Sequence, residues 1–206
     1  DIPAFLPQRV GEATRTGDPL ETVNVRKDGT EVPVELRGGV ISMDGEERVL
    51  VSIRDISQRK SKEKALRKSE EKYRTIFESA SDAIFVMKGT KFIDCNKKTL
   101  EIFDCERDDI IGHYPWKFSP EKQPDGANSK EKAKKNIERA LEGEPQFFEW
   151  THAKLDGTPI PTEVNLNRYN IDGEKFLMAI VRDISGRKRT EKELKRANEK
   201  LVESRE

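Results

Sequence analysis

The stretch IRDISQRKSKEKAL, from Ile53 to Leu66, is closely repeated as VRDISGRKRTEKEL, from Val181 to Leu194. The matched arginines, Arg54 and Arg182, are 182 − 54 = 128 positions apart. At the same offset, KDGTEVPVEL matches LDGTPIPTEV and SMDGEE matches NIDGEK, without a gap. The chain therefore contains one structural unit twice.

Asp-Gly pairs divide each copy into short runs rich in Val, Ile, Thr and aromatic residues. Such pairs are typical of tight turns between antiparallel strands. Each copy is therefore predicted to form three strands joined by two turns. In the second copy the predicted strands cover residues 146–155, 159–169 and 175–184. A charged helix follows, with Asp55 or Ser57 as its expected N-cap in the first copy and Asp183 or Ser185 in the second.

Only the second copy has room for further elements upstream. DAIFVM and TKFIDCN predict two short strands, and KKTLEIF and RDDIIG predict two short helices. A longer helix should begin at Asn128 or Ser129 and end at Gly143, with apolar residues spaced for one buried face. The first copy has only residues 1–20 before its strands, enough for the tail of such a helix. It is therefore expected to be a truncated unit.

This order of elements, with DGT in the hairpin, RDIS at the end of the last strand and a charged helix after it, resembles the PAS domain family. FSPEKQPDGANS and FFEWTHAKLDGT are similar to a PAS subgroup common in bacterial and archaeal kinases. The resemblance implies an α+β PAS fold, with a five-stranded antiparallel sheet, helices on one face and charged linker helices on either side. It also implies a tandem PAS segment of a sensor histidine kinase. The expected boundaries are 1–57 for the C-terminal part of a truncated first PAS domain, 58–80 for a linker helix, 81–185 for a complete PAS domain and 186–206 for a coiled-coil-like C-terminal linker helix.

The resemblance further implies a small cavity between the sheet and the helices. A plain hydrophobic core is the alternative interpretation of the same side chains. Asn96 is included among the candidates, although its amide is expected to satisfy nearby backbone rather than a ligand. The candidate pocket residues are Ile84, Val86, Phe92, Asn96, Leu100, Phe103, Ile110, Trp116, Phe118, Ile137, Phe148, Val164, Leu166, Met178 and Ile180.

The two histidines do not favour a haem or metal site. Haem-binding members of the family place their ligand on the long helix, which has no histidine here, and His113 lies before it. His152 lies on a predicted strand, where a packed or hydrogen-bonded side chain is expected. Cys95 and Cys105 lack the spacing of a zinc site. The region HYPWKFSP lacks the reactive cysteine motif of flavin photosensors, so the residues favour no cofactor and no metal over haem or flavin.

The two charged helices carry matching apolar positions. Leu66, Tyr73, Leu194, Ala197 and Leu201 form a thin stripe that predicts a two-stranded dimer seam. A single solvated helix is the alternative interpretation. The motif at each strand-to-helix exit is expected to pass a signal into the helix, and its residues are Arg54, Asp55, Arg182 and Asp183.

Composition and missing motifs exclude several functions. Lys plus Arg and Asp plus Glu are 39 each, so no net positive field favours nucleic acid or an anionic membrane as a partner. No apolar run approaches the roughly 20 residues that span a bilayer. Two cysteines suit a reducing, cytoplasmic compartment. The helices contain no phosphoacceptor histidine and no glycine-rich nucleotide motif, so this segment is not expected to be an enzyme.

The best hypothesis is a sensory and relay module of a cytosolic two-component signalling protein, a piece of a longer histidine kinase with a kinase domain downstream. A ligand- or haem-binding receptor and a purely structural dimerisation module are the alternatives. The expected partner is a second copy, joined through the linker helices and the truncated unit. That unit is expected either to pair its apolar sheet face with its counterpart or to be poorly ordered. The residues assigned to that face are Val23, Val25, Val32, Val34, Val49 and Val51.

Overall fold

The computed structural model describes the backbone of residues 18–203 and the side chains of residues 18–200. The helix tail predicted within residues 1–20 falls largely outside the described residues. The chain divides into two compact units, Asp1–Tyr73 and Arg74–Glu206.

The first unit is a three-stranded antiparallel sheet in the order β1-β2-β3, followed by a helix. Asp44 and Gly45 form the two-residue turn between β2 and β3, with φ angles of 55° and 82°. Both residues adopt the left-handed conformation that such a hairpin turn requires. The elements are β1 (Leu20–Val25), β2 (Glu31–Met43), β3 (Glu46–Asp55) and α2 (Ser57–Ser79).

The apolar residues of this sheet lie on both of its faces. Val32, Val34 and Leu36 of β2 are buried together. Val23 pairs in register with Pro33, so it faces the side opposite Val32 and Val34. Val25, two residues along the same strand, lies on that side too, and both valines are exposed. The prediction that one face holds all six valines was therefore wrong for Val23 and Val25.

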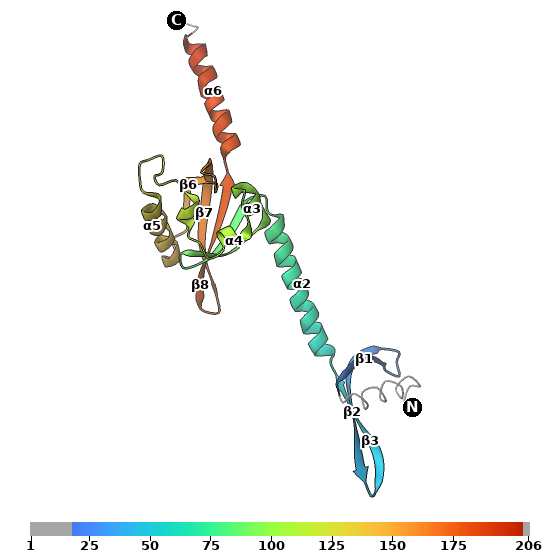
Figure 1. The fold of residues 1–206 in the computed structure, drawn as a ribbon. Helices are drawn as coiled ribbons and strands as arrows, with labels where there is room; N and C mark the ends of the chain where they lie inside the picture. Colours follow the sequence, from blue (N-terminus) through green and yellow to red (C-terminus); the bar gives the residue numbers. More distant parts are fainter. Residues whose placement is uncertain (1–17, 204–206) are drawn as a thin grey trace. The chain divides into compact units, whose positions relative to one another are not determined.

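The second unit has a five-stranded antiparallel sheet in the order β5-β4-β8-β7-β6. Helices α3, α4 and α5, labelled in Figure 1, bury Phe103, Ile110 and Ile137 in one cluster with side chains of the sheet, so they cover the same face. The predicted fold class is confirmed. The elements are β4 (Ala83–Lys88), β5 (Lys91–Cys95), α3 (Lys97–Phe103), α4 (Arg107–Ile110), η1 (Pro115–Phe118), α5 (Ser129–Glu142), β6 (Gln146–Ala153), β7 (Pro159–Ile171), β8 (Glu174–Asp183) and α6 (Ser185–Glu203).

Local sequence accounts for the bounds of the longest helix on the sheet. The side chain of Asn128 accepts a hydrogen bond from the Glu131 amide at 3.2 Å and so caps the start of α5. Gly143 ends the helix with a φ of 107°, a left-handed conformation that costs glycine little. The choice left open between Asn128 and Ser129 is thus resolved in favour of Asn128. The short 3-10 helix η1, which begins with Pro115, was not predicted.

The core of the second unit lies between the sheet and the helices. Phe103 of α3 is fully buried and contacts Phe85 of β4 and Phe118 of η1, with ring centroids 5.5 and 5.7 Å apart. Phe92 of β5 stacks on Phe85 at 4.5 Å. These aromatic contacts join the sheet to two of the helical segments that cover it.

A side chain covers part of the outer edge of β6. Gln123 is buried, and its amide makes two bonds to the backbone of Thr151. The Thr151 amide donates to Oε1 of Gln123 at 2.8 Å, and Nε2 of Gln123 donates to the Thr151 carbonyl at 3.1 Å. The glutamine thus takes the place of a neighbouring strand, which protects an otherwise open edge.

The aromatic core predicts a large difference between two phenylalanine substitutions. Phe103→Ala should destabilise the second unit by about 3–5 kcal/mol because Phe103 is 0% exposed. Phe147→Ala should change stability by less than about 0.5 kcal/mol because Phe147 is 68% exposed. The check is denaturant unfolding followed by tryptophan fluorescence, since both tryptophans, Trp116 and Trp150, lie in this unit. Equal losses of stability would contradict the described packing.

Candidate functional site

A cavity of about 60 Å³ lies between the sheet and the helices of the second unit. Five of the predicted pocket residues line it, namely Phe92, Ile137, Phe148, Val164 and Leu166. The remaining lining residues are Phe85, Met87, Pro115, Ser119, Ala133, Asn136, Trp150, His152, Ala179 and Val181. Most of this wall is apolar, and no lining residue carries a charged side chain.

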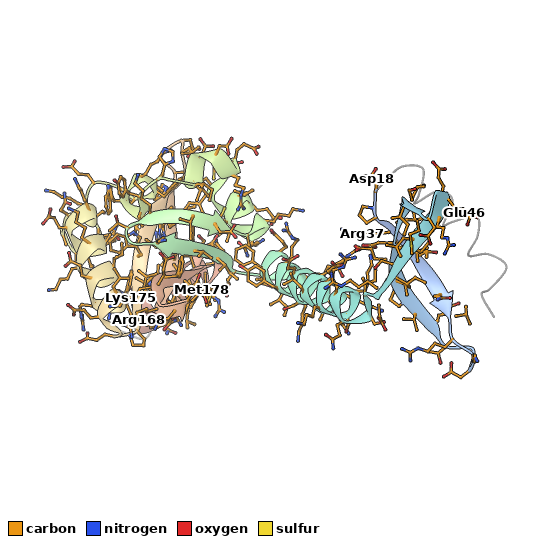
Figure 2. The ribbon with its side chains drawn as sticks, turned by 90° about the horizontal axis from the view of Figure 1, so that it is seen from below. Asp18, Arg37, Glu46, Arg168, Lys175 and Met178 are labelled. Atoms are coloured by element: carbon orange, nitrogen blue, oxygen red, sulfur yellow. The ribbon has the colours of Figure 1, made fainter. Side chains whose placement is uncertain are left out.

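Four predicted pocket residues lie on the opposite face of the sheet. Ile84 and Val86 alternate along β4 with two cavity residues, and Met178 (labelled in Figure 2) and Ile180 alternate along β8 with two more. Neighbouring residues of a strand face opposite sides of the sheet. A prediction that is wrong by one residue therefore assigns every side chain of the strand to the wrong face. DAIFVM is apolar at nearly every position, and Val86 is buried although it faces away from the cavity. The sequence pattern could therefore not decide which residues face inward.

The other predicted pocket residues belong to the surrounding core. Phe103, Ile110 and Phe118 are buried in the main hydrophobic cluster, and Leu100 and Trp116 pack against it partly buried. None of these five lines the cavity. For them the alternative interpretation, plain core, fits their positions.

Asn96 ties several segments together instead of facing the cavity. Its Oδ1 accepts hydrogen bonds from the amides of Ile84 and Thr99, and its Nδ2 donates to the carbonyls of Phe77 and Asp82. The four partners lie on or beside β4, α3 and the last turn of α2. The fully buried Asn96 amide thus holds the end of α2 to the sheet, as expected of a side chain that satisfies backbone.

Asp82, between α2 and β4, is also hydrogen-bonded to β8, the last strand of the sheet in chain order. Nε and Nη2 of Arg182, near the end of β8, donate to its carboxylate at 3.1 and 2.8 Å. These hydrogen bonds from Arg182 to Asp82 raise the pKa of the arginine. Because β4 and β8 are paired neighbours, the bridge connects the segment after α2 to the strand that precedes α6.

The start of α6 is held by a carboxylate and by a group of charged side chains. Oδ1 of Asp183 accepts from the Ser185 amide at 2.7 Å, which satisfies a first-turn amide of the helix. Arg187 lies 2.8 Å from Glu149 of β6 and 3.1 Å from Glu163 of β7, and Lys188 lies 2.7 Å from Glu149. Glu149, Glu163, Arg187 and Lys188 are called the exit cluster below. Hydrogen bonding from Lys188 lowers the pKa of Glu149.

The first unit contains the same arrangement at the start of α2. Oδ1 of Asp55 accepts from the Ser57 amide at 2.8 Å, and hydrogen bonding from the side chain and the amide of Ser57 lowers the pKa of Asp55. Arg59 lies 2.5 Å from Glu21 and 3.6 Å from Glu35, and Lys60 lies 2.5 Å from Glu21. The equivalent positions are 128 residues apart, as in Arg59 and Arg187. Arg54, the fourth predicted exit residue, pairs in register with Glu35.

A buried histidine that lines the cavity is a polar residue that the sequence analysis did not assign to the pocket. His152 of β6 is 9% exposed, and its Nδ1 lies 2.7 Å from Oγ1 of Thr162 on β7. The Thr162 hydroxyl lies 2.9 Å from the carbonyl of Trp150. Burial lowers the pKa of His152 from 6.5 to about 3. The alternation of Phe148, Trp150 and His152 with the more polar Glu149 and Thr151 could have indicated that this ring faces inward.

The predicted seam residues are exposed where their side chains are described. Leu66 of α2 and Leu194 of α6 are each 62% exposed, and Tyr73 and Ala197 are exposed too. Ile76, three residues after Tyr73, was not predicted and is also exposed. The side chain of Leu201 lies outside the described residues.

The cavity is a poor fit for a large prosthetic group. Sites for cofactors and drug-sized ligands usually enclose about 300–1,000 Å³, far more than the 60 Å³ here. Among residues 18–200, no three His, Cys, Asp or Glu side chains lie close enough together to hold a metal ion. No helix in the described part of the chain is both long and apolar enough to cross a membrane.

Comparisons with known proteins agree with this fold. A family model for the PAS domain matches residues 5–58 and 81–186. Sporulation kinase A of Bacillus subtilis is 30% identical over 184 residues, which cover 88% of this chain and 29% of that protein. Sporulation kinase E of the same organism is 30% identical over 180 residues, covering 83% and 23%. The crystal structure of a PAS domain of an HTR-like protein from Haloarcula marismortui is similar with a TM-score of 0.53 and 25% identity, covering 61% of this chain and 99% of that one.

The chain belongs to the PAS domain family, and it is related to the sensor regions of histidine kinases. It spans less than a third of the length of the two sporulation kinases. The two matched segments contain the two copies of the internal repeat; within residues 18–203 the strands of the first are β1 to β3 and those of the second are β4 to β8.

The depressed pKa of His152 predicts a pH-dependent loss of stability. The folded pKa of about 3 lies below the ordinary value of 6.5, so the unfolded chain binds one more proton between these values. The stability associated with the neutral His152 ring is fully present above pH 6.5 and is lost as the pH falls toward 3. At pH 4 the loss of unfolding free energy should amount to about 3 kcal/mol.

The measurement compares the unsubstituted chain with His152→Phe by tryptophan-monitored unfolding between pH 7 and 4. The difference in unfolding free energy between the two proteins should change by about 1.4 kcal/mol per pH unit in this range. Carboxylates titrate in both proteins and cancel in the difference. Parallel pH profiles would show that His152 is not held neutral.

Proposed function

We propose that this chain is a sensory and relay module of a larger signalling protein, in which a change within the PAS unit alters its linker helices. The repeated exit cluster is the observation that carries the proposal. Both helices begin with an aspartate that accepts a first-turn amide, and both have an Arg-Lys pair held by two glutamates on neighbouring strands. These contacts at the start of the helix couple its direction to the geometry of the sheet.

The end of α2 is coupled to the same strands. Asn96 binds the carbonyls of Phe77 and Asp82, and Asp82 binds Arg182 close to the start of α6. A displacement of the last turn of α2 would therefore reach β8 and α6 through hydrogen-bonded groups. This continuity supports a relay in both directions, because energetic coupling between two sites is reciprocal.

The parent protein in this proposal is a histidine kinase. The two sporulation kinases support this assignment by name, and this chain corresponds to less than a third of each. The catalytic domain would follow the segment described here, and the segment itself would bind or transmit without catalysing a reaction. The free cysteines Cys95 and Cys105 support a cytoplasmic location.

The proposed relay works in a homodimer whose linker helices pair in parallel. Exposed apolar side chains on otherwise charged helices support this pairing. Leu66 and Tyr73 are one heptad apart on α2, and Ile76 extends the stripe; Leu194 and Ala197 have the matching 3-residue spacing on α6. In a parallel pair, a change in the sheets of the two protomers would alter the angle at which their paired helices cross.

Breaking the bridge between Asp82 and Arg182 should loosen both helix ends. Asp82→Asn should raise amide hydrogen exchange about fivefold at the last turn of α2 and at the first turn of α6, because a two-bond ion pair of this exposure contributes about 1 kcal/mol at most. The double variant Asp82→Arg with Arg182→Asp should restore slow exchange. The measurement is hydrogen exchange by NMR on the full chain.

The matched control removes an ion pair between β4 and β8 themselves. Lys88 and Glu174 lie 2.8 Å apart at the opposite ends of β4 and β8. Glu174→Gln should leave exchange at both helix ends unchanged. The relay is contradicted if Asp82→Asn alters exchange at one helix end only, or if Glu174→Gln has the same effect.

Dimerisation through the seam predicts a position-specific effect on α6. Leu194→Asp should weaken the dimer by roughly tenfold or more, because burying a leucine contributes about 1.5–3 kcal/mol. Lys192→Asp, two residues earlier and on the other side of the helix, should have a much smaller effect. Sedimentation equilibrium of the full chain measures both. A monomeric chain, or equal effects of the two substitutions, would leave a module that relays without pairing its helices.

A further inference from the structure

The proton of one hydroxyl group fixes the tautomer of His152. Oγ1 of Thr162 has a single proton and lies within hydrogen-bond distance of both the Trp150 carbonyl, at 2.9 Å, and Nδ1 of His152, at 2.7 Å. A carbonyl oxygen can only accept, so the contact with Trp150 is a hydrogen bond only when the Thr162 proton is donated to it. Both bonds then form only if Nδ1 of His152 carries a proton and donates it to Thr162. A neutral ring of this tautomer has an unprotonated Nε2, which is a hydrogen-bond acceptor.

That acceptor has no hydrogen-bond partner among the described residues. Within the described part of the chain, every side-chain nitrogen or oxygen that is completely buried does have one. Nε2 therefore keeps contact with open space, although His152 as a whole is 91% buried (100 − 9). The cavity is the hollow that His152 lines. The burial that lowers the pKa of His152 to about 3 keeps the ring neutral at pH 7.

The rest of the cavity wall selects against charge. A charged ligand would lose its hydration without gaining a partner of opposite charge, because no Lys, Arg, Asp or Glu lines the cavity. Two other polar side chains line it. The Ser119 hydroxyl already accepts from Nε1 of Trp150 at 3.0 Å, and Asn136 is only partly buried on α5. The contacts left for a ligand are one buried acceptor and a surrounding apolar surface.

We propose that the cavity binds a small uncharged molecule with one hydrogen-bond donor, of the class of short-chain alcohols. Its hydroxyl donates to Nε2 of His152 and its carbons contact the apolar side chains of β4, β7 and α5. A single water needs only about 10–15 Å³ of such space, so a cavity of about 60 Å³ has room for a molecule of a few heavy atoms. Water alone is a weaker occupant, because it needs two or more polar partners to be held well.

This inference rests on the proposed function, since the ligand would be the input of the relay. Glu149 on β6 lies between Phe148 and Trp150, which both line the cavity. Glu163 on β7 lies between Thr162, which bonds to His152, and Val164, which lines the cavity. A ligand that shifts these two strands would shift the exit cluster with them.

The test uses 2-propanol and acetone, which share a carbon skeleton but differ in the donor hydroxyl. The full chain, labelled with ¹⁵N-histidine, is titrated with each while the Nε2 shift of His152 is followed by NMR. We expect 2-propanol to change the Nε2 shift along a saturating binding curve. Acetone should bind at least about tenfold more weakly. In His152→Phe the two molecules should bind with equal affinity. Equal binding of both by the unsubstituted chain, or no binding of 2-propanol, overturns the proposal.

A second measurement covers the case in which His152→Phe does not fold. Without any ligand, the ¹⁵N shifts of His152 should show a protonated Nδ1 and an unprotonated Nε2 at pH 7. The opposite tautomer, or a charged ring, overturns the proposal directly. Thr162→Val should abolish the preference for the Nδ1-protonated form and reduce the advantage of 2-propanol over acetone.

The two proposals fail in different experiments. A chain that binds 2-propanol at His152 but shows no joint exchange change in Asp82→Asn has a ligand site without the relay. A chain that shows the joint change but no preference for 2-propanol has the relay without this ligand class.

Discussion

The first amides of a helix need hydrogen-bond partners outside the helix, and partners on the sheet that it leaves also hold it in one direction. In this protein the partners come from three strands. Asp183 at the end of β8 accepts the Ser185 amide, and Glu149 of β6 and Glu163 of β7 hold Arg187. The bonds come from three different strands, so together they restrict the movement of the first turn of α6 on the sheet.

The alternation of side chains along β6 and β7 connects the exit cluster to the cavity. Along β6, Trp150 and His152 line the cavity, while Glu149 points to the other side and binds α6. Along β7, Val164 lines the cavity and its neighbour Glu163 binds Arg187. The same two strands therefore contact the interior with one set of side chains and the helix with the other. In the proposed relay, a small change inside the cavity reaches the helix without any intermediate domain movement.

Local signals in the sequence predicted much of the fold. Asp-Gly pairs located the hairpin turns, and Asn128 and Gly143 marked the ends of α5, because each of these residues satisfies a backbone requirement by itself. The repeat located both helix exits, and the aspartate of each copy accepts the amide two residues later.

The inward side of β4 and β8 could not be predicted, because both faces of these strands carry apolar residues and the pattern loses its alternation. The exit cluster and the bond between His152 and Thr162 join residues 10 to 39 positions apart. Such contacts depend on how strands pair, so no local pattern shows them. Asn96 was expected to satisfy backbone, but its link to the end of α2 required the folded arrangement.

The central claim is that the exit cluster fixes α6 rigidly on its sheet. The most direct measurement is the distance distribution between spin labels at Phe147 on β6 and Glu193 on α6, introduced as unnatural amino acids so that Cys95 and Cys105 stay unmodified. A single narrow distribution is predicted, and it should broaden when Glu149→Gln and Glu163→Gln remove the two carboxylates. A broad distribution in the unsubstituted chain, or a narrow one that ignores both substitutions, would contradict the account.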